Sequence, residues 1–170
     1  MKKTLCTITA LCLFFTLFSQ ETVKVKPVEK NEIKLNLLMT LMSFPEISYE
    51  HVWGSNIGLG ASVGFPVENN STSFQILPYT RFYFGENATK SFFIEASLAF
   101  QSYKNYNYDN YSYNYSSTYH NDFDFGLGVS FGYKYVNSSG LIGELFFGLG
   151  RTFDRDDVYT RIGISIGKQF

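Results

Sequence analysis

The sequence predicts an all-β protein, an eight-stranded antiparallel up-and-down transmembrane β-barrel. Aromatic residues are abundant, with 18 Phe and 13 Tyr, whereas charged residues make up only 17%, below the ~25% usual in soluble domains. Eight segments alternate between apolar and small or polar residues with the period of two that strands have. The last segment, 158–170, sets a bulky apolar face against a face of glycine, serine and one arginine. A strand with one face in lipid and the other in a polar lumen has this pattern.

The first 19 residues have the features of a secretory signal peptide. Lys2 and Lys3 precede the short apolar run 11–18, which matches the basic and hydrophobic regions of such leaders. The run is too short for a membrane-anchor helix, which needs ~20 residues. We therefore expect cleavage near Ser19, a flexible periplasmic lead-in over 20–31 and a barrel domain over 32–170.

The composition of the mature chain limits its chemistry. Both cysteines, Cys6 and Cys12, lie in the leader, so no disulfide, zinc or thiol chemistry is expected after cleavage. Loss of the two leader lysines changes the formal net charge from -1 to -3. A basic patch that would attract nucleic acid is therefore not expected.

Short segments rich in glycine, asparagine, serine, proline or charge separate the expected strands. In order, these strands span 32–42, 46–53, 57–65, 72–84, 91–103, 122–135, 141–152 and 158–170. The clearest is 57–65, in which Ile, Leu, Ala, Val and Phe alternate with Gly and Ser. In the first strand, the apolar face is expected to continue through Leu37, Met39 and Leu41.

Side-chain volume indicates which face points inward. The interior of an eight-stranded barrel is only just wide enough for side chains to fill, so rows of Phe, Leu, Ile and Tyr from every strand would overfill it. Ten of the 14 glycines fall on the opposite face in this register. We therefore expect the small, polar face inside and the apolar face in lipid. A soluble, lipocalin-like barrel with the reverse arrangement is the alternative.

Loop lengths give an independent indication of orientation. The connections after strands two, four and six are short turns near 54–56, 85–90 and 136–140, whereas most other connections are longer and polar. Bacterial barrels keep short turns on the periplasmic side, so both termini are expected in the periplasm. The first outer connection, near Pro45, is an exception because it looks as short as a turn.

Seven charged residues on the inward face are expected to form one network in the lumen. They are Lys34, Glu50, Arg81, Glu95, Lys134, Glu144 and Arg161. Isolated charges in a narrow lumen are costly, so we expect Arg81 and Arg161 to contact carboxylates. A salt-bridged plug is the first interpretation, and a narrow ion channel gated by exchange of partners is the alternative.

Other polar clusters do not amount to a catalytic or metal site. His120 with Asp122 and Asp124 could transfer a proton, but no nucleophile or activated water accompanies them. The aspartates of 154–157 are interrupted by arginine and lack calcium-loop spacing. We therefore expect no catalytic residue, no cofactor and no bound metal, and the protein is predicted not to be an enzyme.

The segment 103–121 is unusually rich in tyrosine and asparagine. Alternating Tyr and polar residues could extend strands five and six as a hairpin above the membrane. Tyr offers a large contact area at low entropic cost, so adhesion or capture of an unknown extracellular ligand is an alternative function. An aromatic belt at the membrane interface is the simpler explanation. The candidate binding residues are Tyr106, Tyr108, Tyr111, Tyr113 and Tyr115.

The chain resembles small outer-membrane β-barrel proteins of Bacteroidota, in the broad group of OmpA-like and OmpX-like barrels. The leader, PEISYEHVW, NIGLGASVGF, PYTRFYFG and the terminal ISIGKQF carry the resemblance, which covers residues 32–170. It implies a structural or interaction role, porin-like architecture and location in the outer membrane of a Gram-negative cell envelope.

The same resemblance implies two partners, outer-membrane lipid and the outer-membrane barrel assembly machinery. That machinery recognises a last strand that ends in an aromatic residue. Phe170, with Ile162, Ile164 and Ile166 on the same face, fits that assembly signal. The resemblance implies no specific activity.

Overall fold

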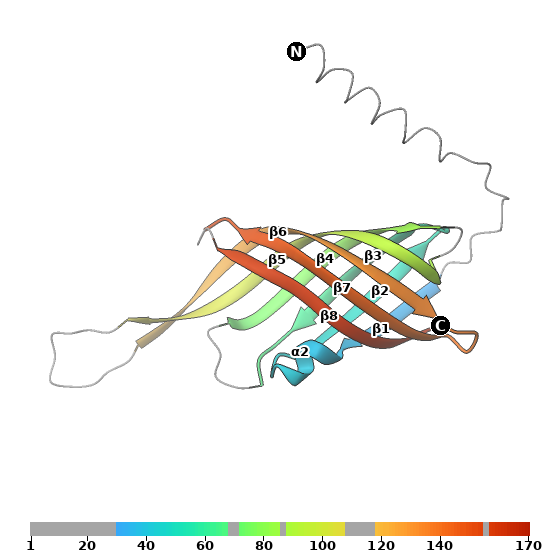
Figure 1. Cartoon of the computed structure of the whole chain (residues 1–170). Helices are drawn as coiled ribbons and strands as arrows, with labels where there is room; N and C mark the ends of the chain where they lie inside the picture. Colours follow the sequence, from blue (N-terminus) through green and yellow to red (C-terminus); the bar gives the residue numbers. More distant parts are fainter. Residues whose placement is uncertain (1–29, 68–71, 86–87, 108–117, 155–156) are drawn as a thin grey trace, which may run out of the picture.

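Eight antiparallel strands close into a barrel in the order of the chain, with β1 paired to both β2 and β8 (Figure 1). This computed structural model describes residues 30–67, 72–85, 88–107, 118–154 and 157–170. The predicted eight-stranded up-and-down barrel is confirmed. Its strands are β1 (Lys30–Asn36), β2 (Glu46–Trp53), β3 (Ile57–Gly64), β4 (Thr72–Phe84), β5 (Lys90–Asn107), β6 (Thr118–Val136), β7 (Leu141–Thr152) and β8 (Val158–Gln169). The expected signal peptide and most of the lead-in lie outside the described residues.

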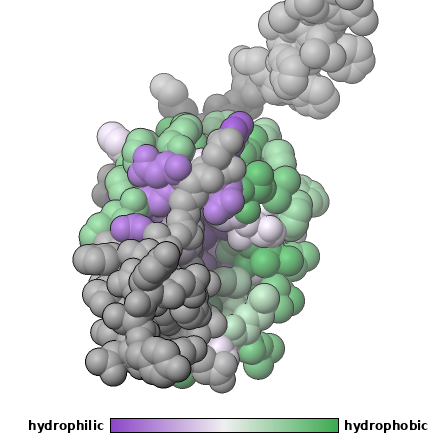
Figure 2. All heavy atoms as spheres, turned by 90° about the vertical axis from the view of Figure 1, so that its left-hand side faces the viewer, coloured by the Kyte–Doolittle hydropathy of each residue, from purple (hydrophilic) through white to green (hydrophobic). Residues whose placement is uncertain are grey.

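The barrel wall has two chemically different faces. In β7, Leu145 and Phe147 are exposed on the outside, whereas Glu144 and Phe146 are buried inside. The same alternation of exposed apolar and buried side chains runs through the other strands. Figure 2, which faces the long-loop end, shows apolar residues around the side of the barrel together with patches of hydrophilic residues. In the described part of the chain, no helix has the length and hydrophobicity to cross a membrane.

The first strand is shorter than predicted, because β1 ends at Asn36 and the helix α2 (Leu37–Leu41) follows it. The Asn36 side chain caps this helix by accepting a hydrogen bond from the Met39 amide at 3.2 Å. Thr40 Oγ1 donates to the Asn36 carbonyl at 2.7 Å. Leu and Met are good helix formers, and apolar residues fall on both faces of the expected strand here. The prediction of strand over 37–42 was wrong.

The helix also changes the interpretation of the loops. The connection from β1 to β2 now spans 37–45, so the short outer connection expected near Pro45 was an artefact of the overlong first strand. The strand ends joined by the short connections after β2, β4 and β6 lie at one end of the barrel, with the start of β1 and the carboxy terminus (Figure 1). The strand ends joined by the longer connections lie at the other end, here called the long-loop end.

One edge of β8 is left without a neighbouring strand. β1 pairs with β8 only from Glu32↔Gln169 to Asn36↔Ser165, whereas β8 pairs with β7 as far as Val158. α2 packs beside the remaining part of β8, and Asn36 Nδ2 donates to the Ile162 carbonyl at 3.1 Å. A covering helix is one way in which proteins protect an unpaired edge.

The longest strands, β5 and β6, have 18 and 19 residues and extend past the other strands at the long-loop end (Figure 1). Their pairing continues to Asn107↔Thr118. The predicted bounds 91–103 and 122–135 were therefore too short. The Tyr-rich segment contributes strand residues at both of its ends.

Candidate functional site

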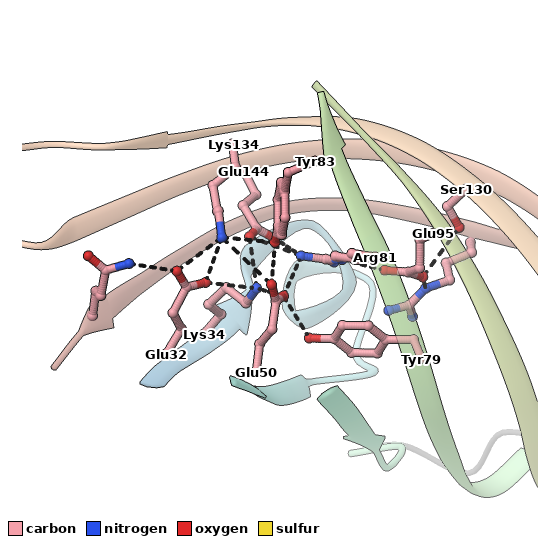
Figure 3. A network of polar contacts seen from close by, with 12 residues as sticks. Glu32, Lys34, Glu50, Tyr79, Arg81, Tyr83, Glu95, Ser130, Lys134 and Glu144 are labelled. Atoms are coloured by element: carbon pink, nitrogen blue, oxygen red, sulfur yellow. Dashed lines mark hydrogen bonds and ion pairs between the residues drawn. The ribbon is translucent and has the colours of Figure 1, made fainter. Parts of the chain in front are cut away.

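Nine charged residues from seven strands gather inside the barrel, and we call them the lumen network. They are Glu32 and Lys34 of β1, Glu46 and Glu50 of β2, Arg81 of β4, Glu95 of β5, Lys134 of β6, Glu144 of β7 and Arg161 of β8. None is more than 5% exposed. All seven residues predicted for a lumen network are among them, and the structure brings them together. Figure 3 labels each of the seven except Arg161.

The network begins at the short-turn end of the barrel. Gln169 Nε2 donates to Glu32 Oε1 at 2.9 Å, and Lys134 Nζ lies 3.0 Å from the same oxygen. Lys134 also donates to the Tyr83 hydroxyl at 2.8 Å, and this hydroxyl donates to Glu50 (Figure 3). The polar atoms at this end are therefore linked into a continuous chain.

Lys34 lies at the centre of three carboxylates. Its Nζ is 2.6 Å from Glu50, 2.8 Å from Glu144 and 3.5 Å from Glu32. The three carboxylates offer oxygens within 4.8 Å of one another, a spacing that could hold a metal ion. The Lys34 ammonium supplies the positive charge at this position. Fully buried carboxylates need such a partner, because an unpaired buried charge is strongly unfavourable.

Arg81 joins this cluster to the rest of the network. Its Nη1 lies 2.9 Å from Glu50 and 3.0 Å from Glu144, and its Nε lies 2.7 Å from Glu95 (Figure 3). The guanidinium also packs 4.2 Å from the centre of the Phe93 ring and 4.6 Å from that of Tyr79. A planar group with several donors can bind carboxylates and stack on rings at once, which lysine cannot do equally well.

Arg161 completes the network toward the long-loop end. Its Nε lies 2.5 Å from Glu95, and its Nη1 lies 2.9 Å from Glu46. Asn36 Nδ2 in turn lies 3.5 Å from Glu46. The ion pairs therefore run without interruption from Glu32 to Glu46, along the lumen and across it.

Two members of the network, Glu32 and Glu46, were not singled out from the sequence. Glu32 shares its strand face with Lys34, and Glu46 shares its face with Glu50. The alternation of inward and outward residues along each strand was therefore sufficient to place both glutamates in the lumen. With them, the network contains five carboxylates and four cations.

Aromatic rings fill much of the lumen beside the charges, in addition to the small and polar residues expected on the inward face. Tyr79, Tyr83, Phe93 and Phe146 are all buried. Inward-facing glycines on other strands leave room for these rings. A Cβ placed on Gly60, for example, would lie 2.5 Å from the Tyr79 ring. The volume argument was right about the inward glycines and incomplete about what they accommodate.

The arrangement makes the lumen a closed, mutually bonded interior. Within the described residues, each of the four cations of the lumen network contacts at least one carboxylate. Breaking one partner out of a buried ion pair is strongly destabilising. The site is thus suited to holding opposite walls of the barrel together.

The predicted binding residues cannot be assigned to a site. Tyr106 belongs to β5, but its side chain is not described, and Tyr108, Tyr111, Tyr113 and Tyr115 lie outside the described residues.

The cluster of His120, Asp122 and Asp124, which was not expected to be catalytic, is described only in part. His120 lies in β6 without a described side chain. Asp124 is buried and accepts a hydrogen bond from the Asp154 amide at 3.1 Å.

The carboxy-terminal residues predicted as an assembly signal lie on the outer face and at the seam of the barrel. Ile164 and Ile166 are about half exposed on the outer face of β8, and Ile162 lies on the same face. Phe170 is exposed, and its backbone exchanges hydrogen bonds with Asn31 at 2.9 and 3.0 Å. The final residue therefore closes the seam between the two ends of the barrel.

Residues 8–168 match the family model described as "Protein of unknown function (DUF3575)", and the chain belongs to this family. No curated protein sequence matches it. The N-terminal β-barrel domain of Pseudomonas aeruginosa OprF is similar in structure, with a TM-score of 0.65 and 14% identity over 85% of this chain and 100% of that domain. Neisserial surface protein A has a TM-score of 0.47 and 14% identity over 83% of this chain and 94% of its own. The likeness to the OprF domain concerns the eight-stranded barrel fold.

Proposed function

We propose that this member of the DUF3575 family is an integral β-barrel protein of the outer membrane of a Gram-negative bacterium, with a structural or interaction role. The two-sided wall carries the proposal. Large apolar side chains are exposed on the outside of all eight strands, whereas the charged residues of the lumen network point inward. In water, this surface would greatly exceed the few hundred Å² of contiguous apolar area usual on soluble monomers.

The backbone of a closed barrel is also compatible with lipid. Hydrocarbon offers no hydrogen bonds to the backbone, so only helices and closed barrels span membranes. The barrel closes through the pairing of β1 with β8, and α2 covers the part of β8 that β1 leaves unpaired. Both devices keep polar backbone groups away from the surrounding lipid.

The two ends of the barrel support an orientation. The start of β1, the carboxy terminus and the short turns share one end, which is periplasmic in bacterial barrels. We include in the proposal export by the signal peptide and recognition of Phe170 by the assembly machinery. A source in Bacteroidota is also part of it and rests on the sequence resemblance.

The proposed insertion is tested with the chain lacking residues 1–19. The protein is refolded into lipid vesicles and run on a detergent gel with and without boiling. We expect the unboiled protein to migrate differently from the boiled protein and the barrel to resist trypsin. A monomer that stays soluble in plain buffer without a gel shift would refute the membrane assignment and favour the lipocalin-like alternative.

The closed lumen supports a structural role over transport, and planar-bilayer recording distinguishes the two. We expect no resolved conductance steps, because the ion pairs and rings fill the lumen. The alternative is a narrow channel, favoured by the unbroken line of charges from Glu32 to Glu46. Steps in the wild type that change size when Arg81 is replaced by Ala would favour the channel.

The projecting hairpin of β5 and β6 favours a second candidate function, adhesion or ligand capture (Figure 1). Its test is deletion of residues 105–117 from the full chain on the bacterial surface. Loss of surface binding with an unchanged gel shift would support adhesion through this hairpin. Unchanged binding would refute it.

A further inference from the structure

We propose that the outer wall carries a site for one glycerophospholipid, with its phosphate at Lys90 and one acyl chain in an adjacent aromatic groove. The inference rests on the membrane location proposed above. The groove crosses β4 to β8 on the outer wall and has a volume of about 480 Å³. Its outward-facing lining consists mainly of Phe84, Phe92, Phe131, Tyr133, Leu145 and Phe147.

Rings from neighbouring strands build the groove. Phe92 is the register partner of Phe84 on one side and of Tyr133 on the other. The Phe92 and Tyr133 ring centroids are 4.9 Å apart in an edge-to-face arrangement. On the next row, Phe131 pairs with Phe147. These side chains are between 39% and 67% exposed, so the described part of the chain does not fill the groove.

A cation stands at the end of this apolar groove. The next outward-facing row toward the short turns pairs Lys90 with Tyr135, and Lys90 Nζ lies 5.0 Å from the Tyr135 ring. Gly143 is the partner of Tyr135 on β7, and a Cβ placed there would meet nothing within 4 Å. Lys90 therefore lies one outward row beyond Phe92, beside the Tyr135 ring, and the open position at Gly143 lies on the other side of that ring. In the proposed membrane, this row at the start of β5 is the one nearest the lipid head groups on the short-turn side.

The chemistry of the two parts identifies the class of ligand. An apolar groove favours a hydrocarbon chain, and an ammonium group forms a charge-assisted hydrogen bond with a phosphate oxygen. A glycerophospholipid joins these two groups in one molecule, and the surrounding membrane would supply it. Inorganic phosphate or a neutral detergent offers only one of them.

Lys168 provides a matched control on the same wall. It also faces outward at the short-turn end, but its Nζ donates to the Ser139 carbonyl at 2.5 Å. Its register partners are Ile33 and Leu141, so it lies away from the row of Phe92 and Tyr133 that Lys90 adjoins. The two lysines therefore separate a specific site from a general attraction between the rim and anionic lipid.

The test uses the refolded chain in a neutral detergent, titrated with phosphatidylglycerol and followed by native mass spectrometry. We expect one retained lipid, with affinity lowered roughly tenfold by Lys90→Gln, the loss of about one charge-assisted hydrogen bond. Lys168→Gln should leave the affinity unchanged. Inorganic phosphate at the same concentration should not compete.

Two results would overturn the site. Equal losses in Lys90→Gln and Lys168→Gln would indicate a nonspecific basic rim, and competition by inorganic phosphate would indicate an anion site without a chain-binding groove. The gel shift of each variant is recorded in parallel. A chain that fails to insert contradicts the membrane proposal, whereas a folded barrel without selective lipid retention contradicts only the lipid site.

Discussion

Arg81 and Glu95 face each other across β4 and β5, with the arginine Nε 2.7 Å from the glutamate Oε2. The other carboxylates that contact Arg81 come from β2 and β7. A cross-strand neighbour and two residues from distant strands thus share one guanidinium. Arg81 thus connects several strands of the wall across the lumen. Among the residues of the lumen network, its replacement should lower the stability of the barrel most.

Replacing Arg81 by Leu should lower the free energy of unfolding by about 3–5 kcal/mol, the usual cost of breaking a buried ion pair. The physical reason is that Glu50, Glu95 and Glu144 would each lose a cationic partner. Arg81→Lys should cost less than Arg81→Leu but should not restore full stability, because lysine lacks the planar set of donors. Urea unfolding of the barrel in detergent micelles measures both changes.

Lys90→Gln is the control for this prediction, since Lys90 lies on the exposed rim. Its effect in detergent without phospholipid should stay within about 0.5 kcal/mol, as for most surface substitutions. If Arg81→Leu lowers the free energy of unfolding no more than the control does, the lumen network does not stabilise the barrel.

Lys34 and Glu144 should be energetically coupled although they are far apart in the sequence. Lys34→Met leaves the Glu144 carboxylate without one of its two cationic partners. Glu144→Gln removes the negative charge that this loss would leave poorly compensated. The double variant should therefore be less destabilised than the sum of the two single variants, with a coupling of about 0.5–3 kcal/mol. A double-mutant cycle by urea unfolding measures this coupling. Strict additivity would mean that the 2.8 Å contact does not contribute to stability.

The sequence was sufficient to predict the barrel but not the pairing inside it. Period two places Lys34 and Glu144 on inward faces, yet it cannot say that residues 110 positions apart meet at 2.8 Å. That contact depends on how the strands stagger when the barrel closes. Glu32 and Glu46 occupy inward-facing positions in the same alternation, so the sequence would also have allowed them in the predicted network. The sequence could therefore place the seven charged residues on inward faces, and their connections required the three-dimensional register.

The error at α2 has a local cause. Leu37, Met39 and Leu41 continue the outward parity of β1, but Leu38 and Met42 are apolar as well. An apolar run of this kind fits a helix as well as a strand. The Asn36 cap decides the outcome by satisfying the Met39 amide. Asparagine before such a run was a usable sign of a helix start.

Gly60→Ala should destabilise the barrel by about 1–3 kcal/mol, the usual cost of overpacking a well-packed interior. The added Cβ would lie 2.5 Å from both the Tyr49 carbonyl and the Tyr79 ring. Gly143→Ala is the matched change on the outer face, where a Cβ meets nothing within 4 Å. Its effect should be neutral or slightly stabilising, because alanine reduces the entropy of the unfolded chain. Equal effects of the two changes in thermal unfolding would contradict the assignment of inward and outward faces.

Two substitutions on β7 test whether the outer wall lies in hydrocarbon. Phe147 and Leu141 are outward-facing residues with nearly equal exposure, 53% and 55%. Leu141 is the first residue of β7 at the short-turn end, whereas Phe147 lies in the middle of the strand. In water, arginine at either position would have a similar, small effect. In a bilayer, the cost depends on depth, at about 2–4 kcal/mol near the midplane and about 0–1 kcal/mol near the interface.

We therefore expect Phe147→Arg to be much more destabilising than Leu141→Arg when unfolding from lipid vesicles is measured. The same pair in neutral detergent should show a smaller difference, since a micelle has no fixed midplane. Equal costs in vesicles would show that the middle of β7 does not face the hydrocarbon core.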